Sequence, residues 1–84
     1  MSLGAEIEHV VRRLDQRLAC CLIATEAMMQ LLDMHHHQPV APEQAGPLHD
    51  YLARQFERYQ ARQMTREHLL ANLEAARDLH LVMD

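Results

Sequence analysis

The sequence predicts an all-α protein built as an antiparallel helical hairpin of two long helices, which dimerises into a four-helix bundle. Hydrophobic residues make up 49% of the chain but aromatic residues only 4%, so the apolar content is Leu, Ala, Met and Val, the residues of helix–helix packing. Two glycines and three prolines are too few turn residues for a small all-β fold. Apolar residues also recur at helical spacing along most of the chain.

The first helix is predicted over about residues 5–36. From Ile7 onward, apolar residues recur at intervals of three and four with no glycine or proline between them. Further apolar residues on both sides make this stripe wide, as in a helix that faces two or three neighbours. We expect the stripes of the two helices to form the core or dimer interface, with these members: Ile7, Val11, Leu14, Leu18, Cys21, Met28, Leu32, Leu52, Phe56, Leu70 and Leu73.

A proline-rich turn is predicted over residues 37–47, which contain all three prolines and one of the two glycines. The residue before Pro39 is disfavoured in the helical region, so the first helix should end at His36 or Gln38. Pro42 and Pro47 both suit the first turn of a new helix. We expect the second helix to begin after Pro47, with a short helical turn from Pro42 as the alternative.

The second helix is predicted over about residues 48–82. Its apolar stripe is interrupted by a polar segment, residues 62–68, in which Met64 is the apolar exception. Two interpretations follow. Thr65 could cap the start of a third helix, or one helix could continue through, bent or broken near Met64-Thr65. We favour the continuous helix because the segment contains no helix-breaking residue.

The chain is predicted to be a single domain, residues 1–84, that forms a homodimer. A domain of 84 residues buries only a modest core, and a lone hairpin leaves half of the wide first stripe uncovered. Pairing two hairpins would cover it. A compact three-helix monomer is the alternative.

Composition and motifs narrow the function classes. The sequence contains no Ser-His-Asp pattern, glycine-rich phosphate loop or HExxH motif, so we predict no enzyme, no catalytic residue and no cofactor. The longest apolar run is too short for a membrane span. Cys20 and Cys21 are adjacent and ill-placed for a mutual disulfide, which favours reduced thiols and a cytoplasmic location.

A partner-binding face is predicted on the second helix, where arginines recur every four residues beside two tyrosines. Arginine and aromatic residues are enriched in binding hot spots. The predicted face comprises Tyr51, Arg54, Arg58, Tyr59, Arg62 and Arg66. We therefore expect a protein-binding module: a regulator, adaptor or inhibitor that acts through helix–helix contacts with a partner protein. A small nucleic-acid-binding hairpin that uses the arginines ranks third, because the net charge is −4.

A metal-binding or metal-sensing bundle is the second hypothesis. Three histidines stand together at positions 35–37, but consecutive helical residues point about 100° apart and cannot all bind one ion. Asp33 with His36 or His37 has the required helical spacing, and His49 could join them across the turn. Such a mixed nitrogen and oxygen site would suit zinc or nickel. The simpler interpretation is a polar helix end.

Overall fold

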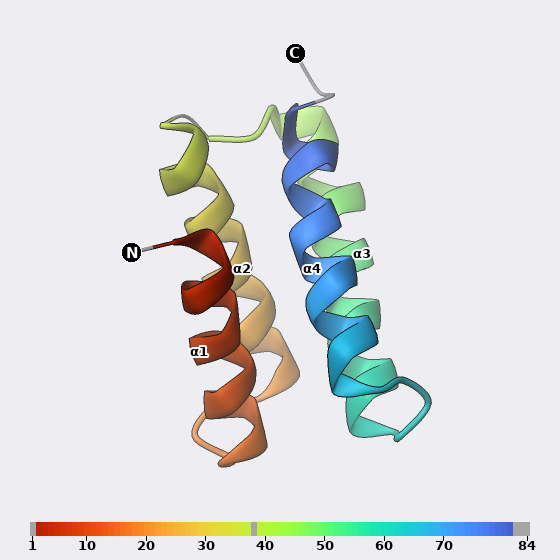
Figure 1. The fold of residues 1–84 in the computed structure, drawn as a ribbon. Helices are drawn as coiled ribbons and strands as arrows, with labels where there is room; N and C mark the ends of the chain where they lie inside the picture. The colour runs from red at the N-terminus through yellow and green to blue at the C-terminus, as the bar shows by residue number, and fades with distance from the viewer. Residues whose placement is uncertain (1, 38, 82–84) are drawn as a thin grey trace.

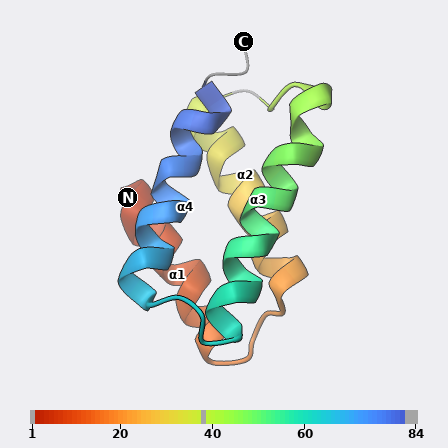
Figure 2. The same cartoon turned by 90° about the vertical axis from the view of Figure 1, so that its right-hand side faces the viewer.

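The part of the chain that the structure describes folds into four helices rather than two. A computed structural model describes residues 2–37 and 39–81, in which the helices are α1 (Leu3–Asp15), α2 (Cys21–His36), α3 (Pro42–Gln60) and α4 (Arg66–Leu81). Each helix runs antiparallel to the next, and the four lie side by side as an up-down bundle (Figure 1). α1 packs on α2 and α4, and α3 packs on α2 and α4 (Figure 2). The all-α class is therefore confirmed.

Both predicted long helices are broken near their middles. The first reverses at residues 16–20 and the second at residues 61–65, so the longest dimension of the molecule is 34 Å and not the roughly 45 Å of a thirty-residue helix. The prediction of two long helices, about 5–36 and about 48–82, is wrong in this respect. Residue 82 lies outside the described residues. The four-helix arrangement is reached within one chain.

The two breaks share one backbone geometry, the Schellman motif. Arg17 and Arg62 adopt the left-handed conformation, with φ of 59° and 60°. The amide of Leu18 donates to the carbonyl of Arg13 at 2.8 Å, and the amide of Gln63 donates to that of Arg58 at 2.9 Å. These bonds satisfy the free carbonyls at the ends of α1 and α3. Neither break contains the glycine that usually marks such a motif.

The two hairpins, α1–α2 and α3–α4, are equivalent in layout. Arg17 and Arg62 stand 45 positions apart in the sequence, and buried residues repeat at the same interval. The repeated buried pairs are Leu3 and Leu48, Ile7 and Leu52, Val11 and Phe56, Ala24 and Leu69, and Met28 and Leu73. Because each apolar stripe continues after its reversal, the two halves of the stripe fold onto each other and form the core.

The starts of α3 and α4 also differ from the favoured prediction. α3 begins at Pro42, and Pro47 lies inside it, so residues 42–47 belong to the helix and not to the turn predicted over residues 37–47. Pro42 at the first helical position loses no intrahelical bond, which makes it a suitable start. α4 begins at Arg66 after Thr65, whose hydroxyl accepts a hydrogen bond from the amide of His68 at 3.1 Å. Thr65 is therefore the N-cap of the alternative interpretation.

Most of the predicted core residues lie inside the bundle. Those that the structure buries are Ile7, Val11, Leu14, Met28, Leu32, Leu52, Phe56 and Leu73. Cys21 and Leu70 are half-buried against this core. Leu18 was expected in the core, but its side chain is 63% exposed because the reversal at residues 16–20 turns it outward. Gln55 is buried as well, and its amide oxygen accepts from Asn72 Nδ2 at 2.8 Å, which links α3 to α4.

Candidate functional site

One end of the bundle carries both hairpin loops, and we call it the loop end: residues 12–24 and 57–69. α2 begins at this end of the bundle, where it contacts the last residue of α3. Cys21 Sγ donates a hydrogen bond to Gln60 Oε1 at 3.0 Å. A cleft of about 620 Å³ opens between the two loops. Its lining residues are Leu14, Asp15, Arg17, Tyr59, Gln60, Arg62, Gln63, Met64 and Thr65.

A polar network joins the two hairpins at this cleft. The Tyr59 hydroxyl donates to Asp15 Oδ1 at 2.7 Å. Arg66 lies 3.8 Å from Asp15 and 3.7 Å from Glu8, so α4 is tied to α1 by two ion pairs. Burial raises the pKa of Tyr59, as do the hydrogen bond and the charge of Asp15, so the phenol stays protonated at neutral pH. The network fixes the relative position of the two loops.

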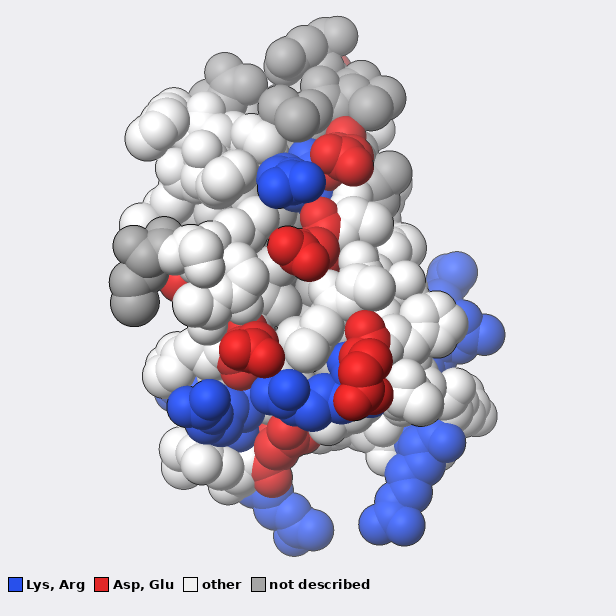
Figure 3. All heavy atoms as spheres, viewed as in Figure 1, with Lys and Arg blue, Asp and Glu red and all other residues white. Residues whose placement is uncertain are grey.

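Arginine is concentrated at the loop end. Six of the eight arginines lie there, namely Arg12, Arg13, Arg17, Arg58, Arg62 and Arg66, against three carboxylates, Asp15, Glu57 and Glu67. The other acidic residues that the structure describes lie outside these two segments, although Glu8 pairs with Arg66, so the loop end has more arginines than carboxylates while the net charge of the chain is −4. Figure 3 shows most of the visible arginine atoms in the lower half of the molecule, where the loops lie, with some side chains projecting downward from it.

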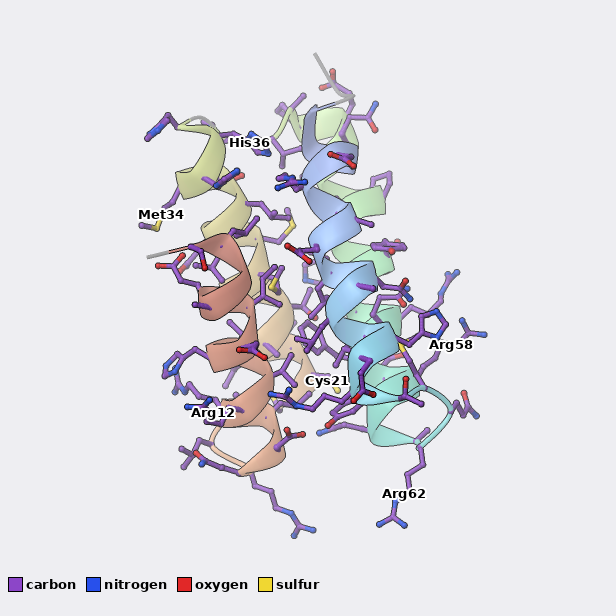
Figure 4. The ribbon with its side chains drawn as sticks, viewed as in Figure 1. Arg12, Cys21, Met34, His36, Arg58 and Arg62 are labelled. Atoms are coloured by element: carbon purple, nitrogen blue, oxygen red, sulfur yellow. The ribbon has the colours of Figure 1, made fainter. Side chains whose placement is uncertain are left out.

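The predicted partner-binding face is not one continuous ribbon. Arg54 and Arg58 are exposed on α3, but Arg62 lies in the loop and points away from the bundle (Figure 4). Arg66 belongs to α4 and forms the two ion pairs with α1. The break at residues 61–65 therefore separates arginines that a continuous helix would have aligned. Arg17 had not been predicted, although it repeats Arg62 in the other hairpin.

The two tyrosines of the predicted face bind within the bundle. Tyr51 is half-buried, and its hydroxyl donates to the backbone carbonyl of Asn72 on α4 at 3.1 Å. Burial raises its pKa. Tyr59 is half-buried at the cleft and bonded to Asp15. Both tyrosine hydroxyls thus connect helices. Among the six residues of the predicted partner-binding face, the exposed ones are Arg54, Arg58 and Arg62.

A second feature is an apolar groove of about 270 Å³ between the outer faces of α1 and α2. Its walls are formed by Glu6, His9, Val10, Arg13, Ala19, Ile23, Ala24, Ala27, Gln30, Leu31 and Met34. Ile23 is 49% exposed and Met34 is 69% exposed. Figure 4 shows Met34 pointing away from α4 on the outer side of α2. The wide stripe indicated surplus apolar surface, but it did not identify which part would remain uncovered.

The predicted metal ligands do not converge among the described residues. In that part of the chain, no three His, Cys, Asp or Glu side chains gather closely enough to hold a metal ion. Asp33 accepts a hydrogen bond from the amide of Val40 at 3.2 Å and thereby fastens the turn. His37 ends α2 in the left-handed conformation, with φ of 59°. The rings of His35 and His36 meet edge to face at 5.0 Å.

Both cysteines are free thiols. Cys20 is exposed as the residue before α2, and Cys21 is half-buried. Burial raises the pKa of the Cys21 thiol, and so do the nearby Glu57 and Cys20. A raised thiol pKa lowers the fraction of the reactive thiolate at neutral pH. The hydrogen bond from Cys21 to Gln60 helps to hold α2 against α3.

Within residues 2–37 and 39–81, each helix is too short or too polar to cross a lipid bilayer. Comparison with protein-family models, with curated proteins and with solved structures found no match to this chain.

Proposed function

We propose that the chain is a non-catalytic protein-binding module whose loop end docks on an acidic surface of a partner protein. The concentration of arginine at one end of an otherwise acidic chain carries this proposal. Arg17, Arg58 and Arg62 are exposed there, beside the two exposed leucines Leu18 and Leu22. Charged groups at an interface favour correct partners and speed association, while apolar burial supplies affinity.

The loops present these arginines from a fixed backbone. Each loop arginine stands at the left-handed position of a motif closed by two backbone hydrogen bonds. The bond between Tyr59 and Asp15 then holds one loop relative to the other. A surface that is already ordered loses little conformational entropy when a partner binds. The cleft between the loops has room for a partner side chain between Arg17 and Arg62.

A protein partner is favoured over nucleic acid. Nucleic-acid binders usually have a basic excess over the whole domain, whereas this chain has a net charge of −4. Leu18 and Leu22 are exposed at the same end and can be buried against apolar side chains of a protein partner, whereas a nucleic-acid backbone offers only charged phosphates and sugars.

The test is capture of a partner from the native host by the tagged full chain, followed by affinity measurements with the purified partner. Arg17→Glu and Arg62→Glu should each weaken that affinity by about tenfold or more, because each places a carboxylate against an acidic surface. Arg77→Glu is the matched control, since Arg77 is exposed on α4 away from the loop end. It should leave the affinity within about twofold, as expected for a charge outside an interface.

Three results would count against the proposal. One is a partner whose affinity is the same for all three variants. Another is the absence of any captured protein. The third is nuclease-sensitive capture with a steep loss of binding as salt rises, which would assign the arginines to nucleic acid instead.

A further inference from the structure

α2 has two apolar faces, and only one of them lies in the core. Ala24, Thr25, Met28 and Leu32 are buried against the other helices. The second face points outward along the groove, with Ile23 and Met34 near its two ends and Ala27 between them. Large apolar side chains left in water favour association with another apolar surface.

Opposite charges lie at opposite ends of this groove. The α1 side is lined by Glu6, then His9, then Arg13, along one face of the helix. Glu6 also lines a hollow with Leu31 and Met34, which places this residue at the Met34 end of the groove. Neither Glu6 nor Arg13 forms an ion pair with any residue that the structure describes.

The groove is therefore complementary to itself in the antiparallel sense. Glu6 and Arg13 are seven positions apart along their helix, about 10 Å, and Ile23 and Met34 are eleven positions apart along theirs, about 16 Å. Both pairs are centred on the middle of the groove, where His9 and Ala27 lie. A two-fold axis through that point, perpendicular to the helices, sets Arg13 of one copy against the carboxylate of Glu6 of the other. The same rotation sets Ile23 of one copy against Met34 of the other.

We propose that two copies of this chain associate through the α1–α2 groove, with α1 antiparallel to α1 and α2 antiparallel to α2 across a two-fold axis. In an isologous contact of this kind, both copies use the same surface patch. Glu6 and Arg13 of one copy then pair with Arg13 and Glu6 of the other. The small side chain of Ala27 lets the two α2 helices approach at the axis, while Ile23 and Met34 fill the groove of the other copy. This dimer joins two complete four-helix bundles, and it leaves both loop ends accessible at its opposite extremes.

Sedimentation velocity of the full chain at concentrations up to about 100 μM tests this directly, in the range of ordinary protein associations. Arg13→Glu should weaken the dimer on the order of 100-fold, because it creates two like-charged contacts per dimer. Glu6→Arg should have a similar effect. The double variant Glu6→Arg with Arg13→Glu reverses both signs and should restore the dimer. Met34→Glu, at an exposed position that tolerates charge without unfolding, should give a folded monomer by circular dichroism.

Arg62→Glu is the control for net charge, since it lies outside the groove and should leave the dimer unchanged. A wild-type monomer throughout the concentration range would overturn the proposal, and so would a dimer indifferent to Met34→Glu. A double variant that stays monomeric would overturn the antiparallel pairing. If a photo-crosslinker at Gln30 captured a different protein but no second copy, the groove would serve another partner and the proposal would fail. Each of these outcomes can occur while the Arg17 and Arg62 surface still binds its partner, so failure here is distinct from failure of the proposed function.

Discussion

Replacing Arg62 by glycine should stabilise the protein, whereas the same replacement at Arg54 should destabilise it. Both side chains are exposed, so neither replacement removes buried packing. Residue 62 has φ of 60°, a conformation that costs an L-residue about 1–2 kcal/mol. Glycine avoids that cost but loses about 0.5–1 kcal/mol through its freer unfolded chain. The net gain at residue 62 is therefore about 0.5–1 kcal/mol.

Arg54 supplies the matched control because it lies in the interior of α3. A glycine in an exposed helix interior is less favourable by about 1 kcal/mol, so the two variants should differ by about 1.5–2 kcal/mol. Urea unfolding followed by circular dichroism at one protein concentration measures the difference. With a slope of about 1 kcal/mol per molar urea, the midpoint should rise by about 0.5–1 M for Arg62→Gly and fall by about 1 M for Arg54→Gly.

The outcome that would refute this reasoning is an equal loss of stability in the two variants. Residue 62 would then be right-handed and helical in solution, and the second half of the chain would be one continuous helix. Arg17→Gly provides an independent repeat, because Arg17 has φ of 59° in the equivalent loop. A gain at one loop and a loss at the other would show that the two hairpins do not share the motif.

Two further predictions concern the cleft and the core. The pKa of Tyr59 is raised above its ordinary value of 10.0, so its contribution to stability is complete below that pH and is lost as the pH rises through the folded value. Tyr59→Phe should therefore make the loss of stability above pH 10 shallower in urea titrations at stepped pH, with Tyr51 and Cys21 supplying the remaining slope; an unchanged slope would contradict the assignment. Leu14→Ala should cost about 2–5 kcal/mol, as for a buried leucine, while Leu18→Ala should stay within about 0.5 kcal/mol. Equal losses in thermal melts would mean that Leu18 is buried after all.

The helical class and most of the core could be predicted because helical periodicity is a local property. Ile7, Val11, Met28 and Leu32 fall on one stripe of the sequence, and all four are buried. The stripe is the same whether the helix runs straight or folds back after residue 15, since both halves face apolar surface in either case. Burial could therefore be read from the spacing, but the connection between the two halves could not.

The break after α1 was missed, and the break before α4 was considered only as the alternative near Met64-Thr65, because the main cause of both breaks is tertiary. Neither loop contains glycine or proline, and an arginine in the left-handed conformation leaves no local signal. We infer that the strain at Arg17 and Arg62 is offset by the apolar surface that each reversal buries. That surface comes from residues far apart in the sequence, so a short segment around either loop does not reveal the balance. The interval of 45 residues between equivalent buried positions was the signal that could have revealed two equivalent hairpins.

The candidate surfaces were predicted least well, because a binding face depends on which helices cover which. Arg54, Arg58, Arg62 and Arg66 align only on an unbroken helix, and the loop redirects the last two. The apolar width of the first stripe was visible in the sequence. Only the packing of α1 onto α2 decides that Met34 remains uncovered.

The equivalence of the hairpins makes their difference informative. Leu18, Leu22 and Ile23 are exposed in the first hairpin, and 45 positions later the second hairpin has Gln63, Glu67 and His68. The same places in the same fold therefore accept polar side chains, so folding does not require apolar ones there. Exposed apolar side chains at such places lower solubility without stabilising the monomer. We infer that they are kept for contacts outside the monomer, which is why both proposed interfaces draw their apolar area from the α1–α2 hairpin.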